Sequence, residues 1–123
     1  MAQARGGARI NVMLLVFCVL IHYKIASATT YIVGDKAGWT FGIQSWPTGK
    51  QFHAGDILVF KYNMNVHSVI VTDENGFKTC NTVTGQKFVS GNDQIKLRMG
   101  QNYFICGTPG HCVGGMKMTI SAA

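Results

Sequence analysis

Residues 106–116 read Cys106-Gly-Thr-Pro-Gly-His111-Cys112-Val-Gly-Gly-Met116, a glycine-rich turn around which the rest of the chain can be understood. The turn carries a thiol at one end, an imidazole in the middle and a thioether at the other end, with four residues between successive groups. Sulfur ligands combined with imidazole favour copper, and two His, one Cys and a distant Met form the usual electron-transfer copper site. The turn supplies three of these four ligands, so a second His must come from elsewhere.

The second imidazole has two candidates, because the only other histidines after residue 28 are His53 and His67. His67 opens an apolar run, and strand alternation puts it on the same side as Val69 and Val71, facing the core at a strand end. His53 lies just before a turn and has no potential ligand beside it. We therefore predict His67 as the second imidazole and His53 as a surface or structural residue.

The residues flanking the turn predict strands on both sides. Cys106 ends the hydrophobic segment 103–106, and Met116 begins a segment in which it shares one face with Met118 and Ile120. Taken singly, a strand-end His, a buried Met or a Cys in a disulfide each has an ordinary structural explanation. The joint pattern favours metal binding, and zinc is the weaker candidate because its structural sites use closely spaced Cys pairs that this chain lacks.

The first 28 residues have the pattern of a secretory signal peptide. Arg5 and Arg9 form a positive start, residues 12–21 form a ten-residue apolar segment, and Ala26-Ser27-Ala28 is a small-x-small cleavage site. The apolar segment is shorter than the roughly 20 residues of a membrane span, so an uncleaved anchor is the weaker alternative. We predict a mature chain of residues 29–123, long enough for one compact domain.

Charge narrows the range of partners. Eight of the eleven Lys and Arg and all five acidic residues lie in 29–123, so the net formal charge falls from +6 to +3 without the leader. The basic residues are scattered, which argues against nucleic-acid binding, since that requires a basic stripe or patch. Weak attraction to acidic extracellular polymers is compatible with this charge, as is a purely solubilising role. The residues leading to Ala123 contain no hydrophobic segment that could signal a lipid anchor, so we expect no membrane anchor.

Three cysteines remain after the leader: Cys80, Cys106 and Cys112. Secreted domains usually pair their cysteines, and an odd count suggests one disulfide and one functional thiol. The sequence alone allows three pairings. If Cys106 is a metal ligand, Cys80 and Cys112 remain to pair, and their bridge would stabilise the fold by about 3–4 kcal/mol.

The remaining pattern is mostly β, and no segment after residue 28 has a convincing helical apolar period. Short helical turns are allowed near 39–45 and 83–86, whereas 73–76 reads as a simple turn. Seven or eight short strands separated by turns suggest a β-sandwich. The expected strands are 30–33, 57–62, 67–72, 86–90, 93–97, 103–106 and 116–121.

At this point the chain resembles the phytocyanins, small secreted blue-copper proteins of plants, and among them the plantacyanins or basic blue proteins. The resemblance covers essentially all of residues 29–123. Its motifs are Tyr31-Ile-Val-Gly34, Gly38-Trp39-Thr-Phe41, Phe52-His-Ala-Gly-Asp56, Phe77-Lys-Thr-Cys80-Asn81, Gly91-Asn-Asp-Gln-Ile95 and Tyr103-Phe-Ile-Cys106 with Pro109-Gly-His111-Cys112 and Gly115-Met116.

The resemblance implies an all-β, cupredoxin-like Greek-key β-sandwich with one type 1 copper ion and a disulfide. The implied copper ligands are His67, Cys106, His111 and Met116, and the implied disulfide joins Cys80 to Cys112. Met116 fits plantacyanins, since stellacyanin-like relatives carry Gln there. Ser68 departs from the family, in which Asn often follows the first His and is thought to brace the ligand loop.

For function, the resemblance implies a monomeric, non-enzymatic carrier that transfers one electron by Cu(II)/Cu(I) cycling in the plant apoplast or cell wall. The implied redox partner is a protein or a small redox molecule. The alternative is an extracellular signalling or cell-wall interaction protein in reproductive tissue, like the chemocyanins linked to pollen-tube guidance, in which copper is structural or incidental.

Overall fold

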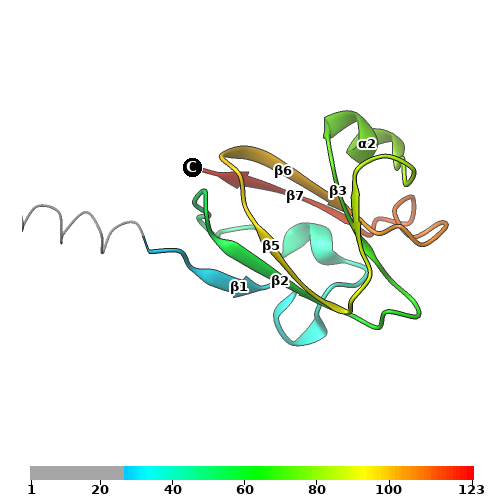
Figure 1. Ribbon diagram of the computed structural model, residues 1–123, viewed down its shortest axis with the longest axis horizontal. Helices are drawn as coiled ribbons and strands as arrows, with labels where there is room; N and C mark the ends of the chain where they lie inside the picture. Colours follow the sequence, from blue (N-terminus) through cyan, green and yellow to red (C-terminus); the bar gives the residue numbers. More distant parts are fainter. Residues whose placement is uncertain (1–26) are drawn as a thin grey trace, which may run out of the picture.

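The computed structural model describes residues 27–123, so the predicted leader lies almost wholly outside the described residues. The described chain folds into a sandwich of two β-sheets (Figure 1). The first sheet has the strand order β1-β2-β5 and the second has the order β4-β3-β6-β7. The strands are β1 (Thr30–Ile32), β2 (Ile57–Lys61), β3 (Val69–Thr72), β4 (Gln86–Phe88), β5 (Asn92–Lys96), β6 (Gly100–Ile105) and β7 (Lys117–Ala122).

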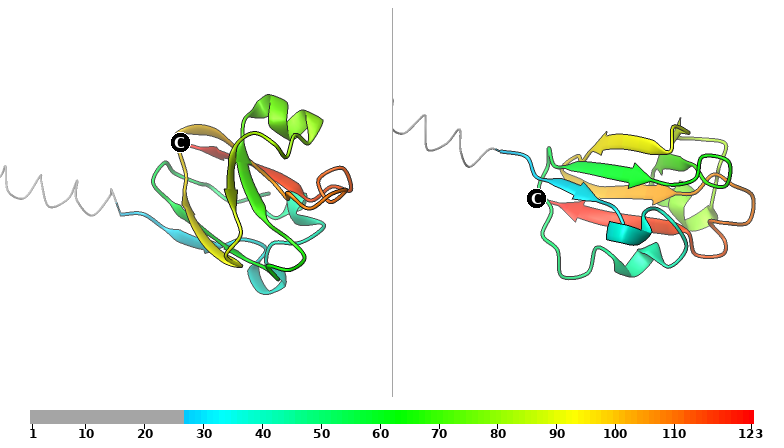
Figure 2. Two further views of the ribbon diagram at one scale, coloured as in Figure 1. Left: turned by 45° about the vertical axis from the view of Figure 1, so that its right-hand side comes forward. Right: turned by 90° about the horizontal axis from the view of Figure 1, so that it is seen from below.

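Strand direction in the second sheet decides where the loops meet. β3, β6 and β7 are neighbours, and both β3–β6 and β6–β7 pair antiparallel. The start of β3, the end of β6 and the start of β7 therefore lie at one end of the sheet. In Figures 1 and 2 this end carries the orange loop between β6 and β7, opposite the end at which the chain enters the domain.

Large apolar side chains fill the space between the sheets. Trp39, Phe60 and Phe104 are almost completely buried, and their ring centroids are 5.2 Å (Trp39–Phe60) and 5.1 Å (Phe60–Phe104) apart. Buried aromatic rings at such separations add to the stability gained from buried area. The indole Nε1 of Trp39 donates to the carbonyl oxygen of Ser68 at 2.9 Å, so the core also fixes the segment that carries His67.

Three short helical elements complete the fold: η1 (Asp35–Ala37), η2 (Ile43–Ser45) and α2 (Glu74–Thr79). The turn predicted at 73–76 was wrong, since Asp73 is the N-cap of α2 and the three residues after it begin this helix. Asp73 caps this helix by accepting the backbone N–H of Gly76 at 2.7 Å, which satisfies a donor that would otherwise have no partner. A helix of six residues is too short to show an apolar period. The alternative helical turn near 83–86 is absent from the described structure, whereas η2 lies within 39–45.

Helix α2 packs on the outer face of the second sheet. A small cluster of Ile70, Ile105 and Cys112 is buried there with Phe77 against it. The Lys117 ammonium lies 4.4 Å from the Phe77 ring centroid and donates to the Phe77 carbonyl oxygen at 3.0 Å. These contacts hold the helix beside the loop that precedes β7. Within residues 27–123, no helix has both the length and the apolar character needed to cross a membrane.

Candidate metal centre

The sheet brings the predicted ligands to one end of the sandwich. His67 lies two residues before β3, Cys106 follows β6 directly, and Met116 directly precedes β7. His111 is in the loop that joins β6 to β7. Because the three strands are antiparallel neighbours, residues 39 positions apart in the sequence, such as His67 and Cys106, come into contact.

The ligand atoms of three of these residues form a compact triangle. The Nδ1 atoms of His67 and His111 are 3.1 Å apart. The Sγ atom of Cys106 lies 3.8 Å from Nδ1 of His67 and 3.7 Å from Nδ1 of His111. No other cluster of three His, Cys, Asp or Glu ligand atoms this compact occurs among the described residues.

The size of this triangle suits a transition metal. A triangle with these sides has one point in its plane about 2.1 Å from each corner, and metal bonds to imidazole nitrogen and thiolate sulfur are about 2.0–2.3 Å long. The three side chains are therefore already spaced for trigonal coordination without rearrangement. Two His and one Cys in a plane form the equatorial set of a blue-copper site.

Met116 completes the surroundings of Cys106. It is fully buried, its carbonyl oxygen accepts the backbone N–H of Cys106 at 3.1 Å, and its N–H donates to the carbonyl oxygen of His111 at 2.9 Å. The thioether therefore belongs to a residue that is hydrogen-bonded to both neighbouring ligands. Together the four residues provide a His-Cys-His-Met set suited to one type 1 copper ion.

The predicted disulfide is confirmed, because Cys80 and Cys112 are bonded. Cys106 is the one free cysteine among the described residues, and it is buried. The bridge joins the residue that follows α2 to the residue that follows His111. It therefore anchors the ligand loop to the outer helix, and such support around a ligand fixes its orientation.

Ser68 braces the site although it departs from the family pattern. Its hydroxyl is buried and accepts the backbone N–H of Gly107, next to Cys106, at 3.0 Å. Gly107 is needed for this approach, since a Cβ there would lie 2.6 Å from the Ser68 oxygen. A second bond runs in parallel, because the Thr108 hydroxyl donates to the carbonyl oxygen of Val66 at 2.7 Å. Two hydrogen bonds thus tie the segment of His67 to the segment of Cys106.

We expect Ser68→Ala to lower the free energy of unfolding by about 1–2 kcal/mol, because it leaves the partly buried N–H of Gly107 without its partner. The copper affinity should fall within the 10–100-fold range typical of residues that support metal ligands. Chemical denaturation and competition with a copper chelator measure the two effects. Thr79→Ala is the matched control, since it removes an exposed hydroxyl whose hydrogen bond, to the carbonyl oxygen of Asn75, stays within α2. Equal effects of both variants would contradict the bracing role.

The environment of His67 favours neutral imidazole. Burial lowers the pKa of His67, and the nearby His111 ring lowers it further. Neutral imidazole is the form that binds metal. The ring of Phe41 covers both histidines, with centroids 4.8 Å from His111 and 6.0 Å from His67. Phe41 was not predicted as a site residue, although it belongs to the aromatic-rich stretch after Trp39.

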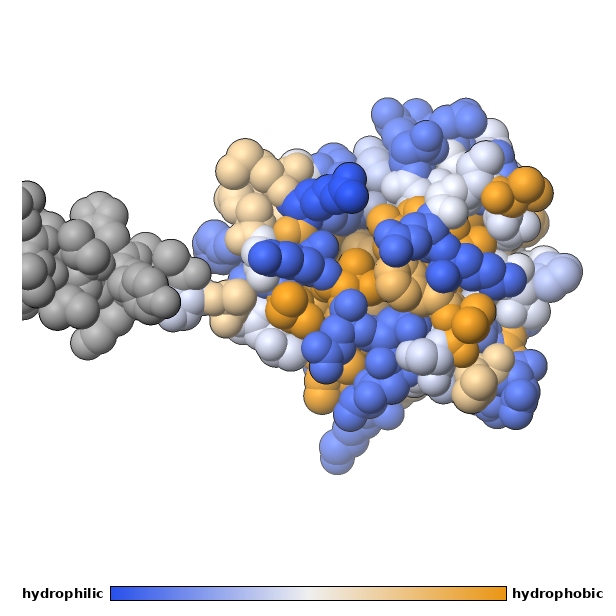
Figure 3. Space-filling view, viewed as in Figure 1, coloured by the Kyte–Doolittle hydropathy of each residue, from blue (hydrophilic) through white to orange (hydrophobic). Residues whose placement is uncertain are grey.

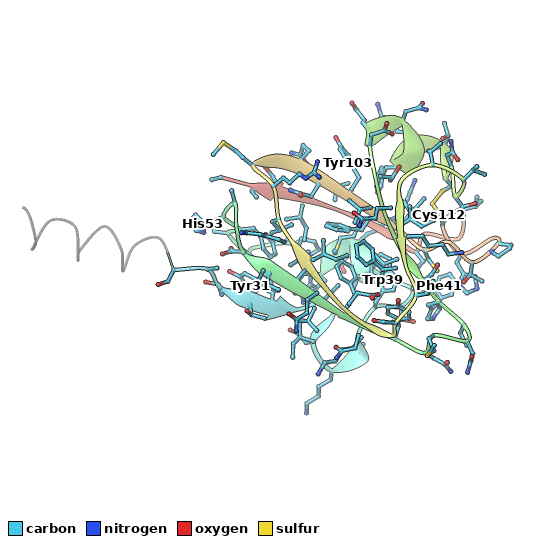
Figure 4. All side chains as sticks on the ribbon, viewed as in Figure 1. Tyr31, Trp39, Phe41, His53, Tyr103 and Cys112 are labelled. Atoms are coloured by element: carbon cyan, nitrogen blue, oxygen red, sulfur yellow. A yellow bond between two sulfur atoms is a disulfide. The ribbon has the colours of Figure 1, made fainter. Side chains whose placement is uncertain are left out.

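His53 lies at the opposite end of the molecule from Phe41 and Cys112 (Figure 4). Its side chain is 67% exposed, and its Nδ1 atom is 3.9 Å from a carboxylate oxygen of Asp56. This position agrees with the interpretation of His53 as a surface or structural residue and not as a ligand.

Comparison with known proteins supports the geometry. Residues 39–116 match the family model described as the plastocyanin-like domain. The chain is 48% identical to chemocyanin of Lilium longiflorum over 126 residues, with both chains covered completely. It is 57% identical to the basic blue protein of Cucumis sativus over 93 residues, which cover 75% of this chain and 97% of that protein.

The fold of this chain is also similar to that of a solved blue copper protein. The structure of cucumber basic protein, a blue copper protein, superposes with a TM-score of 0.75 at 53% identity, covering 77% of this chain and all of that chain. This likeness and the two observed sheets confirm the predicted cupredoxin-like, all-β sandwich. The three comparisons and the spacing of the ligand atoms agree. The chain therefore belongs to the plastocyanin-like, or phytocyanin, family of blue copper proteins.

Proposed function

We propose that this protein is a secreted one-electron carrier that holds one copper ion with His67, Cys106, His111 and Met116. The observation that carries the proposal is the triangle of two Nδ1 atoms and one Sγ atom, sized for trigonal coordination. Bound copper would supply the Cu(II)/Cu(I) couple. Met116 would supply the weakest of the four ligands, a thioether.

The chain contributes rigidity and a shielded thiol. Cys106 is completely buried, so bulk water does not reach its sulfur. The strand ends, the disulfide and the two hydrogen bonds of Ser68 and Thr108 hold the ligands in one arrangement. A frame that moves little between oxidation states keeps the reorganisation that accompanies electron transfer small. With four protein ligands, no coordination position is left for a substrate, which supports a carrier and not an enzyme.

Electrons would enter and leave near His111, where the site approaches the surface. Both histidines are only partly buried, and Phe41 beside them is 48% exposed. Val66, which directly precedes His67, and Val113, two residues after His111, are also exposed. A redox protein or a small redox molecule approaching this apolar rim would come within contact distance of a ligand ring.

Secretion is supported by the leader pattern and by the disulfide. A disulfide persists in oxidising compartments such as the extracellular space, and Cys80–Cys112 is formed while Cys106 is free. We propose that residues 1–28 are removed and that residues 29–123 act as a monomer in the plant apoplast. The mild positive charge would assist binding to acidic cell-wall polymers.

An extracellular signalling role is the second candidate, because the chain is similar to chemocyanin over the whole length of both proteins. Pollen-tube guidance by the natural protein and by Cys106→Ser would separate the two roles. Guidance that persists without the copper site would exclude electron transfer as its cause.

Copper titration of the protein secreted from the full chain tests the main proposal. We expect one equivalent of Cu(II) to bind, an intense visible thiolate-to-copper band to develop in proportion, and voltammetry to show a reversible one-electron wave. A band that saturates at one equivalent would support the proposed site. Colourless binding, or no binding, would refute it.

A further inference from the structure

Asp56 is a buried carboxylate at the end of the sandwich opposite the metal centre. It is 2% exposed and accepts two backbone N–H groups, that of Thr29 on Oδ1 at 2.9 Å and that of His53 on Oδ2 at 2.8 Å. Among the described residues, its one ionic neighbour is the largely exposed His53 ring at 3.9 Å. Acidic side chains are rarely buried to this extent unless they are paired with a cation.

The nitrogen of Thr29 is the atom to which this carboxylate points. Thr29 is itself held in place, because its carbonyl oxygen accepts the N–H of Ile57 at 2.9 Å where β1 pairs parallel with β2. Residues 27–30 are exposed. In Figure 3 the chain leaves the surface of the domain at this point. The Ala28–Thr29 peptide bond is thus exposed, and its nitrogen, which would become the amino terminus on cleavage, bonds Asp56.

We propose that cleavage of the Ala28–Thr29 bond creates the cation that Asp56 lacks, so that removal of the leader installs a salt bridge between the new amino terminus and Asp56. Hydrolysis consumes one water molecule, leaves a carboxylate on Ala28 and an amino group on Thr29, and the amino group takes up a proton near neutral pH. The proposal rests on the predicted cleavage site but not on copper binding.

The conversion strengthens a contact that exists before cleavage. The same nitrogen donates in both forms. Before cleavage it belongs to a neutral amide, whereas after cleavage both partners are charged, so Coulomb attraction adds to the hydrogen bond. β1 has only three residues. A stronger bond at Thr29, just before this strand, therefore helps to hold β1 against β2. The other titratable side chains near Asp56 are those of His53 and Lys96. Lys96 makes no ion pair with Asp56, although its Cε atom lies beside Gly55.

The test uses the full chain, secreted from a eukaryotic host, and begins with amino-terminal sequencing of the product. A variant with Gly-Ser inserted between Ala28 and Thr29 moves the charge away from Asp56 but keeps the Thr29 amide. We expect the natural product to begin at Thr29 and the extended product to melt lower by about 4–8 °C. Thr29→Ser, which keeps the amino group in place, is the matched control and should melt like the natural protein.

Asp56→Asn separates a salt bridge from a general effect of the extension. In a protein that carries Asp56→Asn, the Gly-Ser insertion should no longer lower the melting temperature. If the insertion lowered it as much as it does in the natural protein, the proposed salt bridge would be refuted. Should that variant not fold, the titration of the Thr29 amine in the natural protein decides instead. A pKa above the ordinary range of about 7.7–8.0 supports the pair, and a value within that range refutes it. A product that begins at another residue would refute the cleavage site separately.

Discussion

Cys106→Ser is expected to abolish the intense visible absorption of the copper-loaded protein and to lower its copper affinity by more than about 100-fold. The thiolate is the donor in the charge-transfer band and the strongest of the four ligands. Losing it should exceed the 10–100-fold cost of altering residues that only support ligands. Visible spectroscopy and competition with a chelator measure the two effects.

Met118→Leu is the matched control for this substitution. Met118 is as deeply buried as Met116 and belongs to β7, but its side chain is not among the proposed ligands. The exchange conserves volume, so stability should change by less than about 1.5 kcal/mol and the visible band should remain. A band that survives in Cys106→Ser, with the Cys80–Cys112 bridge intact, would show that the copper chromophore lies elsewhere.

Much of this site could be predicted because its constraints are local in the sequence. The turn from Cys106 to Met116 contains three ligands at even spacing, and the strands on either side set its ends. His67 could be chosen as the second imidazole because side chains alternate between the two faces of the strand that follows it. The position of His67 beside Cys106 follows from the antiparallel pairing of β3 with β6. Alternating residues predict a strand, but they do not show which strand it pairs with.

The features that were missed depend on contacts between distant residues. Helix α2 forms because Asp73 caps it and Phe77 packs on the sheet, whereas its six residues show no period of their own. Phe41 covers the histidines through a loop whose path the sequence does not specify. Ser68 stands where Asn often follows the first His in the family. The hydrogen bond from the Gly107 N–H to the Ser68 hydroxyl becomes apparent only in the folded structure.

Removal of the disulfide should have the largest effect on stability. The bridge joins residues 32 positions apart, and loop-closure entropy predicts that its loss lowers the free energy of unfolding by about 3–4 kcal/mol. For a domain of this size, that corresponds to a fall in melting temperature of at least about 12 °C. We expect this result for the double variant Cys80→Ala, Cys112→Ala, measured by denaturation of the copper-free protein.

Both cysteines must be replaced together, because a single substitution would leave a thiol free to pair wrongly with Cys106. The double variant should also release copper faster, since Cys112 adjoins His111 and the bridge is the covalent link between the ligand loop and α2. Ile70→Val, which trims the cluster next to the bridge, is the control and should cost only about 0.5–1.5 kcal/mol. If the double variant lost no more stability than this control, the bridge would contribute little beyond packing. If copper release were unchanged, the loop would be held by its hydrogen bonds alone, namely those that Ser68 and Thr108 make across to the segment of His67.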